Sequence, residues 1–168
     1  MPLQRGQRVL VDTNVIIAAH DSGCLPQLLD GFRVCTVEEV IVETQRGRQR
    51  RRPERTINEA WLRERLELIG TVTDEQRLEF TLTHQSVGLD EGERDLLIWA
   101  ATIEDAWLLN SPDMGVVRFA HQVNWLDRLV SLDAMCRVIN ARLTQNLPDN
   151  FRDDWLVRKR TELRLGAL

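Results

Sequence analysis

The chain has 168 residues and a formal net charge of −4, with 43% hydrophobic and 29% charged residues. This length suits one compact domain, and the composition excludes global disorder. No apolar run approaches the roughly 20 residues of a membrane span, and the N-terminus has no apolar signal segment, so we expect a cytoplasmic protein without a membrane partner. The three cysteines lack metal-site spacing and suit reduced thiols. They are Cys24, Cys35 and Cys136.

Short apolar runs alternate along the chain with segments of helical period. We expect strands at Val9–Val11, Val34–Val37, Leu66–Val72, Trp107–Leu109 and Leu129–Leu132. We expect helices at Asn14–His20, Val37–Arg46, Asn58–Arg65, Asp74–Gln85, Glu91–Asp105, Pro112–Gln122 and Asp133–Arg142. This alternation is typical of a parallel sheet with helices packed on its faces. The sequence therefore predicts an α/β fold.

The C-terminal segment differs from the rest. Residues 151–165 mix apolar residues such as Trp155 and Leu163 with many charges. We expect a helix there that docks on its own domain or on a second subunit. The predicted organisation is a domain over residues 1–145 with a helical extension over residues 146–168.

Almost all basic residues are arginines, since Lys159 is the one lysine among 22. The net negative charge argues against a surface that coats nucleic acid by charge alone. One arginine-rich segment could nevertheless bind RNA phosphates, because a guanidinium can form two hydrogen bonds to one phosphate. The same segment also suits a solvated loop, and the sequence favours neither interpretation. Its arginines are Arg46, Arg48, Arg50, Arg51, Arg52 and Arg55.

Asp12 directly follows the first predicted strand. Ligands of open parallel sheets bind beyond the carboxyl ends of the strands, so an acid there is a candidate metal or phosphate ligand. Asn14 is placed to orient Asp12. The Asp-Thr-Asn sequence lacks the second carboxylate of an aspartyl-phosphate phosphatase, so we do not expect a covalent aspartyl phosphate.

Three further acids fall on two predicted helices that would reach the same edge. Glu43 lies near the apolar stripe of its predicted helix, and an acid beside a buried face needs a partner such as a metal ion. Glu91 and Asp95 project from one face at the start of another helix. Because apolar residues follow Asp95 directly, we expect Asp95 to be the inner ligand and Glu91 a helper.

The last candidate acid, Asp113, follows the fourth predicted strand in a loop that also contains Asn110 and Ser111. Carboxylates clustered without histidine favour Mg²⁺ or Mn²⁺. Such an ion can activate water against a phosphodiester, so the expected reaction is metal-dependent hydrolysis. The histidines show no ligand spacing; they are His20, His84 and His121.

Taken together, these motifs resemble the PIN-domain family of nucleases over about residues 8–132. The most specific match is Asp12-Thr-Asn14 after a strand. Glu43, four residues before Gly47, matches the second motif, and the helix start Gly92-Glu-Arg-Asp95 matches the third. The strand and polar loop of residues 108–113 match the last.

The resemblance implies a Rossmann-like three-layer α/β/α sandwich with a central parallel sheet. It also implies one or two Mg²⁺ or Mn²⁺ ions held by Asp12, Glu43, Asp95 and Asp113, with Asn14 supporting Asp12, and cleavage of RNA. Many relatives are toxins restrained by an antitoxin protein, and homodimers are common among them. A second hypothesis is a PIN-like RNA-binding or protein-interaction module with little or no activity.

Overall fold

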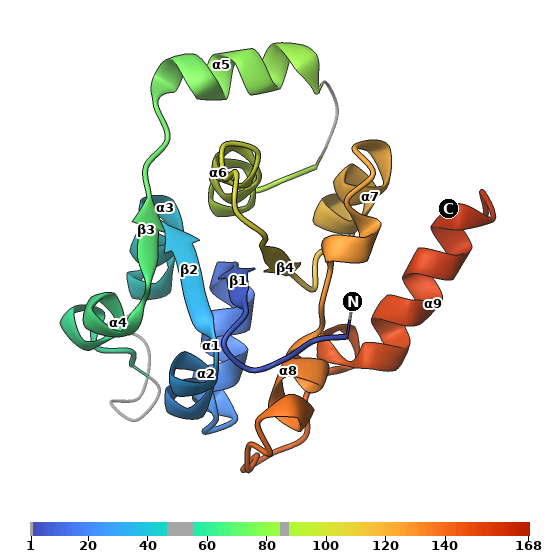
Figure 1. Ribbon diagram of the computed structural model, residues 1–168. Helices are drawn as coiled ribbons and strands as arrows, with labels where there is room; N and C mark the ends of the chain where they lie inside the picture. The colour runs from blue at the N-terminus through green and yellow to red at the C-terminus, as the bar shows by residue number, and fades with distance from the viewer. Residues whose placement is uncertain (1, 47–55, 85–87) are drawn as a thin grey trace.

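The computed structural model, which describes residues 2–46, 56–84 and 88–168, has an α/β fold. A four-stranded parallel sheet lies between helices, in keeping with a Rossmann-like three-layer sandwich (Figure 1). The strands are β1 (Arg8–Val11), β2 (Arg33–Val37), β3 (Leu68–Gly70) and β4 (Leu108–Asn110), in the spatial order β3-β2-β1-β4. The predicted fold class is confirmed.

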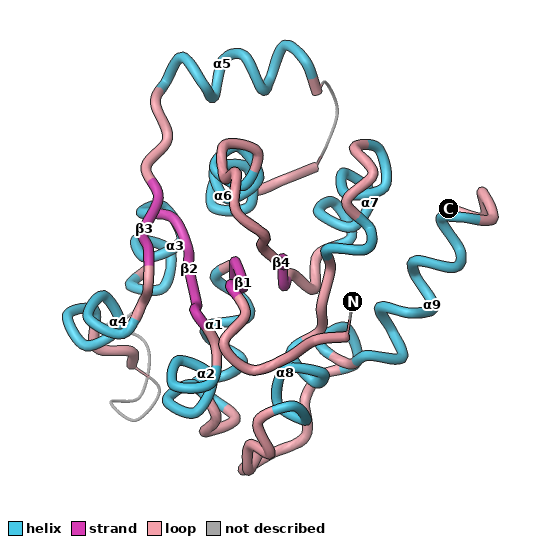
Figure 2. Tube along the Cα trace, in the orientation of Figure 1, coloured by secondary structure: helices cyan, strands magenta, loops and turns pink. Residues whose placement is uncertain are grey.

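Helices surround the strands, which Figure 2 shows grouped at the centre. The helices are α1 (Thr13–Asp21), α2 (Leu25–Gly31), α3 (Glu38–Gln45), α4 (Glu59–Arg65), α5 (Asp74–Thr83), α6 (Glu91–Ala100), α7 (Met114–Gln122), α8 (Leu132–Val138) and α9 (Asp153–Arg164). Two short 3₁₀ helices are η3 (Leu126–Arg128) and η4 (Asp149–Phe151). In the part of the chain that the structure describes, no helix combines the length and apolar character needed to cross a membrane.

The strand order reverses at β1. The chain moves from β1 to β2 and β3 on one side, then crosses back to place β4 on the other side of β1. Leu10 of β1 is therefore in register with both Cys35 of β2 and Leu109 of β4. In open parallel sheets, the carboxyl ends of strands at such a reversal form the usual binding crevice. Here that edge carries the residues that follow β1 and β4.

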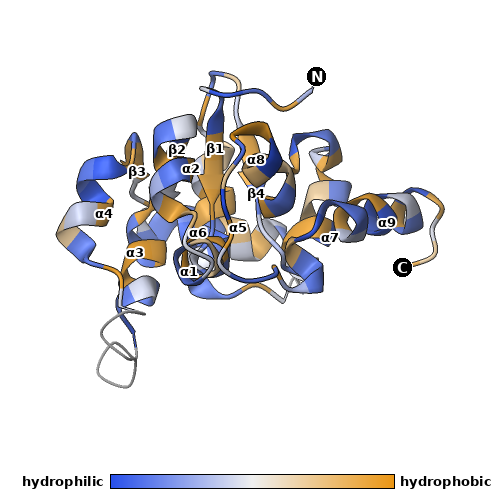
Figure 3. Cartoon of the chain, turned by 90° about the horizontal axis from the view of Figure 1, so that it is seen from below, coloured by the Kyte–Doolittle hydropathy of each residue, from blue (hydrophilic) through white to orange (hydrophobic). Residues whose placement is uncertain are grey.

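The core lies around the two central strands. Val9, Leu10 and Leu109 are fully buried, as are Ile41 of α3 and Leu62 of α4. Figure 3 shows hydrophobic residues along β1 and on the adjoining sides of several helices. Removing this apolar surface from water stabilises the sheet at about 25 cal/mol per Å². The rigid strands then position the loops at their ends.

The predicted fifth strand at Leu129–Leu132 is wrong. Leu129 makes an isolated parallel bridge with Leu109, and the Val130 amide donates to the Leu109 carbonyl at 2.9 Å. The next residue, Ser131, accepts a hydrogen bond from the Ala134 amide at 3.0 Å and so begins α8. An N-cap residue with a helix behind it cannot continue a strand.

Some helix boundaries also differ from the predicted ones. The α2 helix was not predicted; it carries a proline in its first turn, where the missing amide costs nothing. The α8 helix ends at Val138 rather than Arg142, because Asn140 adopts a left-handed φ of 54° and the Ala141 amide returns to the Cys136 carbonyl at 2.9 Å. The α6 helix ends at Ala100 rather than Asp105.

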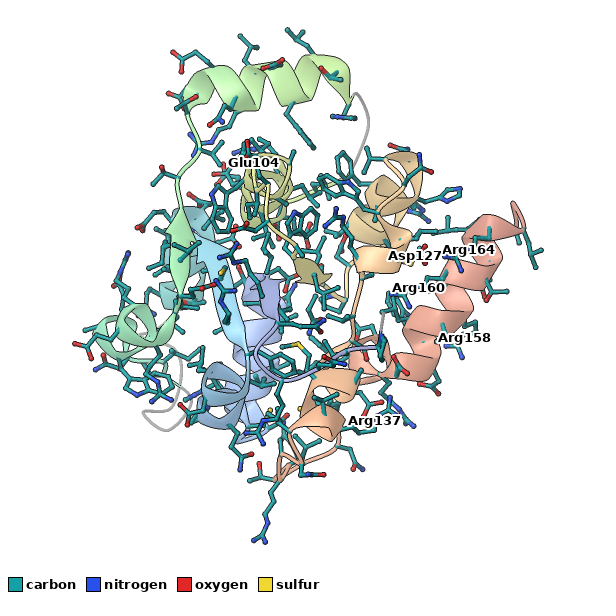
Figure 4. The ribbon with its side chains drawn as sticks, viewed as in Figure 1. Glu104, Asp127, Arg137, Arg158, Arg160 and Arg164 are labelled. Atoms are coloured by element: carbon teal, nitrogen blue, oxygen red, sulfur yellow. The ribbon has the colours of Figure 1, made fainter. Side chains whose placement is uncertain are left out.

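The C-terminal helix α9 packs on its own chain. Trp155, Leu156 and Leu163 are buried. Figure 4 shows Arg160 and Arg164 on the side of α9 that faces Asp127. Arg160 Nε donates to the Leu126 carbonyl at 3.0 Å, and Arg164 lies 2.6 Å from the Asp127 carboxylate. The boundary at residue 145 stays a prediction.

Candidate functional site

Asp12 follows β1, and its side chain links the end of β1 to the loop that follows β4. It is the N-cap of α1, where Oδ1 accepts from the Val15 amide at 2.9 Å, and its Oδ2 accepts from the Ser111 hydroxyl beyond β4. The side chain is only 1% exposed. Burial raises the pKa of Asp12 to about 7, and the nearby charges of Asp90 and Asp113 also raise it.

Asp113 is the N-cap of α7, which begins just beyond β4. Its Oδ1 accepts from the amides of Gly115 at 2.6 Å and Val116 at 3.3 Å. The Asp113 amide in turn donates to the Ser111 hydroxyl at 3.3 Å, so one serine contacts both acids. These bonds hold Asp113 at the edge occupied by Asp12.

Glu43 reaches the same region from α3. Its Oε2 accepts from the Thr13 hydroxyl at 2.5 Å, and its Oε1 accepts from the Gly92 amide at 2.9 Å. Burial raises the pKa of Glu43, and the charges of Asp90 and Glu39 add to this. Glu43 therefore links the first turns of α1 and α6.

The start of α6 contributes two acids that the sequence patterns did not single out. Asp90 and Glu93 form a capping box: the Glu93 amide donates to Asp90 Oδ1 at 2.8 Å, and the Asp90 amide donates to Glu93 Oε2 at 3.1 Å. Glu93 is 5% exposed. Burial raises its pKa to about 8, and the charges of Asp113, Asp90 and Asp12 raise it further. Glu93 therefore lies within electrostatic range of both Asp12 and Asp113, the acids that follow β1 and β4.

Asp95 has a different environment. It is 2% exposed but forms ion pairs with Arg77 of α5 at 2.8 Å and with Arg94 at 3.0 Å. Among the described residues, no hydrogen bond or ion pair joins Asp95 to Asp12 or Asp113. Its charge is balanced by arginines, and it ties α5 to α6.

The supporting residues are also distributed unevenly. Ser111 bonds Asp12 directly, whereas Asn110 is buried and its Nδ2 lies 3.1 Å from the sulfur of Met135 on α8. Asn14 is exposed in the first turn of α1. The bonds that orient Asp12 therefore come from Val15 and Ser111.

The remaining candidates lie at the periphery of this edge. Glu91 is exposed and lies 3.6 Å from Arg46, which also pairs with Glu39 at 2.9 Å. Arg46 thus closes the end of α3 beside the start of α6. The other predicted RNA-binding arginines lie outside the described residues; they are Arg48, Arg50, Arg51 and Arg52.

Five carboxylates define what we call the acidic cluster. Within the described residues 2–46, 56–84 and 88–168, none of these five carboxylates lies within ion-pair distance of an arginine or lysine. Nor are three or more histidine, cysteine or acidic side chains of these ranges arranged so that they could hold a metal ion. All donors of the cluster are oxygens, which fits a hard cation such as Mg²⁺ or Mn²⁺ in chemistry. The members are Asp12, Glu43, Asp90, Glu93 and Asp113.

A local signal for the two missed acids is present in the sequence. The spacing of Asp90 and Glu93 matches a capping box, which predicts the helix start and a Glu93 side chain that folds back on it. Four acids nevertheless fall between positions 90 and 95, and the pattern does not say which of them turns inward. Helix orientation against the sheet decides that.

Comparison with known proteins identifies no family for this chain. No family model matches the sequence, and no curated protein matches it. The function is therefore inferred from the acidic cluster and its place at the sheet.

Proposed function

We propose that the chain is a Mg²⁺- or Mn²⁺-dependent endoribonuclease of the PIN type. One observation carries this proposal: carboxylates from four separate segments gather at the carboxyl edge of β1 and β4 without an arginine or lysine partner among the described residues. Two of these carboxylates, Asp12 and Glu93, are buried. Burying an uncompensated carboxylate is costly, and a bound cation would offset that cost. The same edge is where parallel α/β sheets bind ligands.

The residues have distinct expected roles. Asp12, Glu43, Glu93 and Asp113 would hold the cation, while the hydroxyls of Thr13 and Ser111 orient two of these carboxylates. Several carboxylate oxygens already accept protein hydrogen bonds, so binding requires them to use their remaining lone pairs or to turn. A bound ion would neutralise phosphodiester charge and lower the pKa of an attacking water. The products would carry 5′-phosphate and 3′-hydroxyl ends.

RNA is the proposed substrate, and the end of α3 supports this. Arg46 begins the arginine-rich segment three positions after Glu43, about one helical turn. Arg46 would contact a phosphate next to the acidic cluster and offset part of the repulsion between the cluster and RNA. An antitoxin protein that restrains the enzyme, and a homodimer, are partners proposed from the family resemblance.

The test is cleavage of a labelled RNA panel with Mn²⁺, Mg²⁺ or EDTA. We expect wild-type protein to cut with either metal, and Asp12→Asn to lose at least about 100-fold in rate, since even partners behind the ligands contribute 10- to 100-fold at metal sites. Asp149→Asn is the matched control, because that carboxylate is 68% exposed and belongs to η4. Equal cutting by wild type and Asp12→Asn would contradict the proposal.

A catalytically weak RNA-binding or protein-interaction module is the second candidate. It is favoured by the ion pairs of Asp95 and by the absence, among the described residues, of acids already arranged around a common metal position. Such a module would bind RNA or a partner protein equally well with Asp12→Asn. RNA binding without metal-dependent cutting by either protein would favour this candidate.

Gly92→Ala should reduce cleavage by roughly 10- to 100-fold without unfolding the protein. A Cβ at this position would clash with Glu43 Oε2, so the Glu43 carboxylate must move and lose its bond from the Gly92 amide. Gly88→Ala is the control, because a Cβ there meets nothing within 4 Å. Comparing the two cleavage rates at equal circular dichroism signal checks this prediction. Unchanged cleavage by Gly92→Ala would mean that the position of Glu43 is unimportant.

A further inference from the structure

Two buried cysteines face one another far from the acidic cluster. Cys24 is the residue before α2, and Cys136 belongs to α8, 112 positions later in the chain. Their sulfur atoms are 3.6 Å apart, and both side chains are buried in the core. A disulfide has an S–S length of about 2.0 Å, so the two sulfurs would need to approach by roughly 1.5 Å.

The two segments that carry these thiols are held together on either side of the pair. The Thr144 amide donates to the Ser22 carbonyl at 2.9 Å, just before Cys24. The Arg142 amide donates to Gln27 Oε1 at 3.1 Å. These contacts fix the turn between α1 and α2 against the chain that follows α8. Approach of the sulfurs therefore requires side-chain movement rather than rearrangement of the fold.

A glycine makes a further close contact beside the pair. Gly31, at the end of α2, packs so tightly on Ile139 that an added Cβ would lie 2.5 Å from Ile139 Cγ2. Ile139 directly follows α8, so at this point the Ile139 side chain packs directly on the backbone of α2. This close packing keeps Cys24 and Cys136 opposite each other.

We propose that Cys24 and Cys136 form an intramolecular disulfide when the protein meets a hydroperoxide. The bond would join α2 to α8 and enclose the segment that carries every member of the acidic cluster except Asp12. It would constrain the unfolded chain over a long loop and so raise stability. This proposal is independent of nuclease activity.

The chemistry balances with one peroxide as the oxidant. The Cys136 thiol donates a hydrogen bond to the Cys24 sulfur, which lowers the pKa of the Cys24 thiol. The Cys24 thiolate attacks one peroxide oxygen, the O–O bond breaks, and the hydroxide leaving group takes up the proton released by Cys24 to form water. The Cys136 sulfur then attacks the sulfenic acid and expels a second water, which carries the Cys136 proton. Two thiols and one hydrogen peroxide give one disulfide and two waters.

The third cysteine serves as an internal comparison. Cys35 lies in β2, and its thiol donates to Glu67 Oε2 at 3.3 Å. Burial and the neighbouring Glu67 carboxylate raise the pKa of Cys35 to about 12, so its reactive thiolate is scarce. We expect Cys35 to remain a thiol when the other two are oxidised.

The experiment treats the reduced full chain with hydrogen peroxide, alkylates the remaining thiols after denaturation, and measures the intact mass and the peptide map. We expect one alkylated thiol of the three, a linked peptide pair containing Cys24 and Cys136, and a melting temperature raised by roughly 5 °C or more. The Cys35→Ser variant should keep the link, and Cys136→Ser should lose it. Three alkylated thiols, oxygen adducts without a link, or a link through Cys35 in the wild-type peptide map would overturn the proposal, whether or not either variant folds well.

Discussion

If the chain is the proposed nuclease, Glu93→Gln should lower RNA cleavage by at least about 100-fold, whereas Asp95→Asn should leave the rate of the folded protein within about threefold of wild type. Glu93 is buried within electrostatic range of Asp12 and Asp113 and has no ion-pair partner among the described residues. The Asp95 carboxylate is instead paired with Arg77 and Arg94. Cleavage rates with Mn²⁺, measured for both variants at one temperature, check the prediction.

The melting temperatures of the two variants distinguish a loss of folding from a loss of activity. Asp95→Asn leaves Arg77 and Arg94 without their shared partner, so we expect a lower melting temperature for this variant. Assays are therefore run well below the melting temperatures of both variants. If Asp95→Asn abolished cleavage while Glu93→Gln retained it, Asp95 would be the α6 ligand, as the family motif suggests.

Asp12→Asn should raise the melting temperature at pH 8 in EDTA by roughly 5 °C, although the same change is expected to lower the cleavage rate at least about 100-fold. The pKa of Asp12 is about 7 in the folded protein, against about 4 in an unfolded chain. Between these values the folded state binds a proton that the unfolded state has released. The free energy of unfolding must therefore fall as pH rises from about 4 to 7, and this loss is complete above pH 7.

Asparagine removes this loss and keeps the helix cap, because its side-chain oxygen can accept from the Val15 amide. Thermal melts of wild type and Asp12→Asn between pH 5 and 8 should diverge as pH rises. Mn²⁺ should stabilise wild type more at pH 8 than at pH 5, since protons compete with the metal. Parallel pH curves for the two proteins, with no response to Mn²⁺, would rule out an uncompensated charge at Asp12.

Local patterns determined the fold class and the first acid. The apolar run Val9–Val11 predicts a buried strand from three adjacent residues, and Asp12 follows it directly, so its place at the carboxyl edge needs no tertiary information. The same holds for Glu43, whose position on α3 follows from helical period. By contrast, the run at Leu129–Leu132 has the composition of a strand, but the capping bond of Ser131 outweighs it.

Only the tertiary structure decided which carboxylates share an environment. Asp95 is neutralised by Arg77, 18 positions earlier, and Asp12 is held by Ser111, 99 positions later. The spacing of apolar residues in the sequence indicates which face of a helix or strand is buried, because buried positions recur at a regular interval along the element. The charge balance of a buried acid depends instead on single side chains brought from distant segments, and no local pattern encodes that partnership.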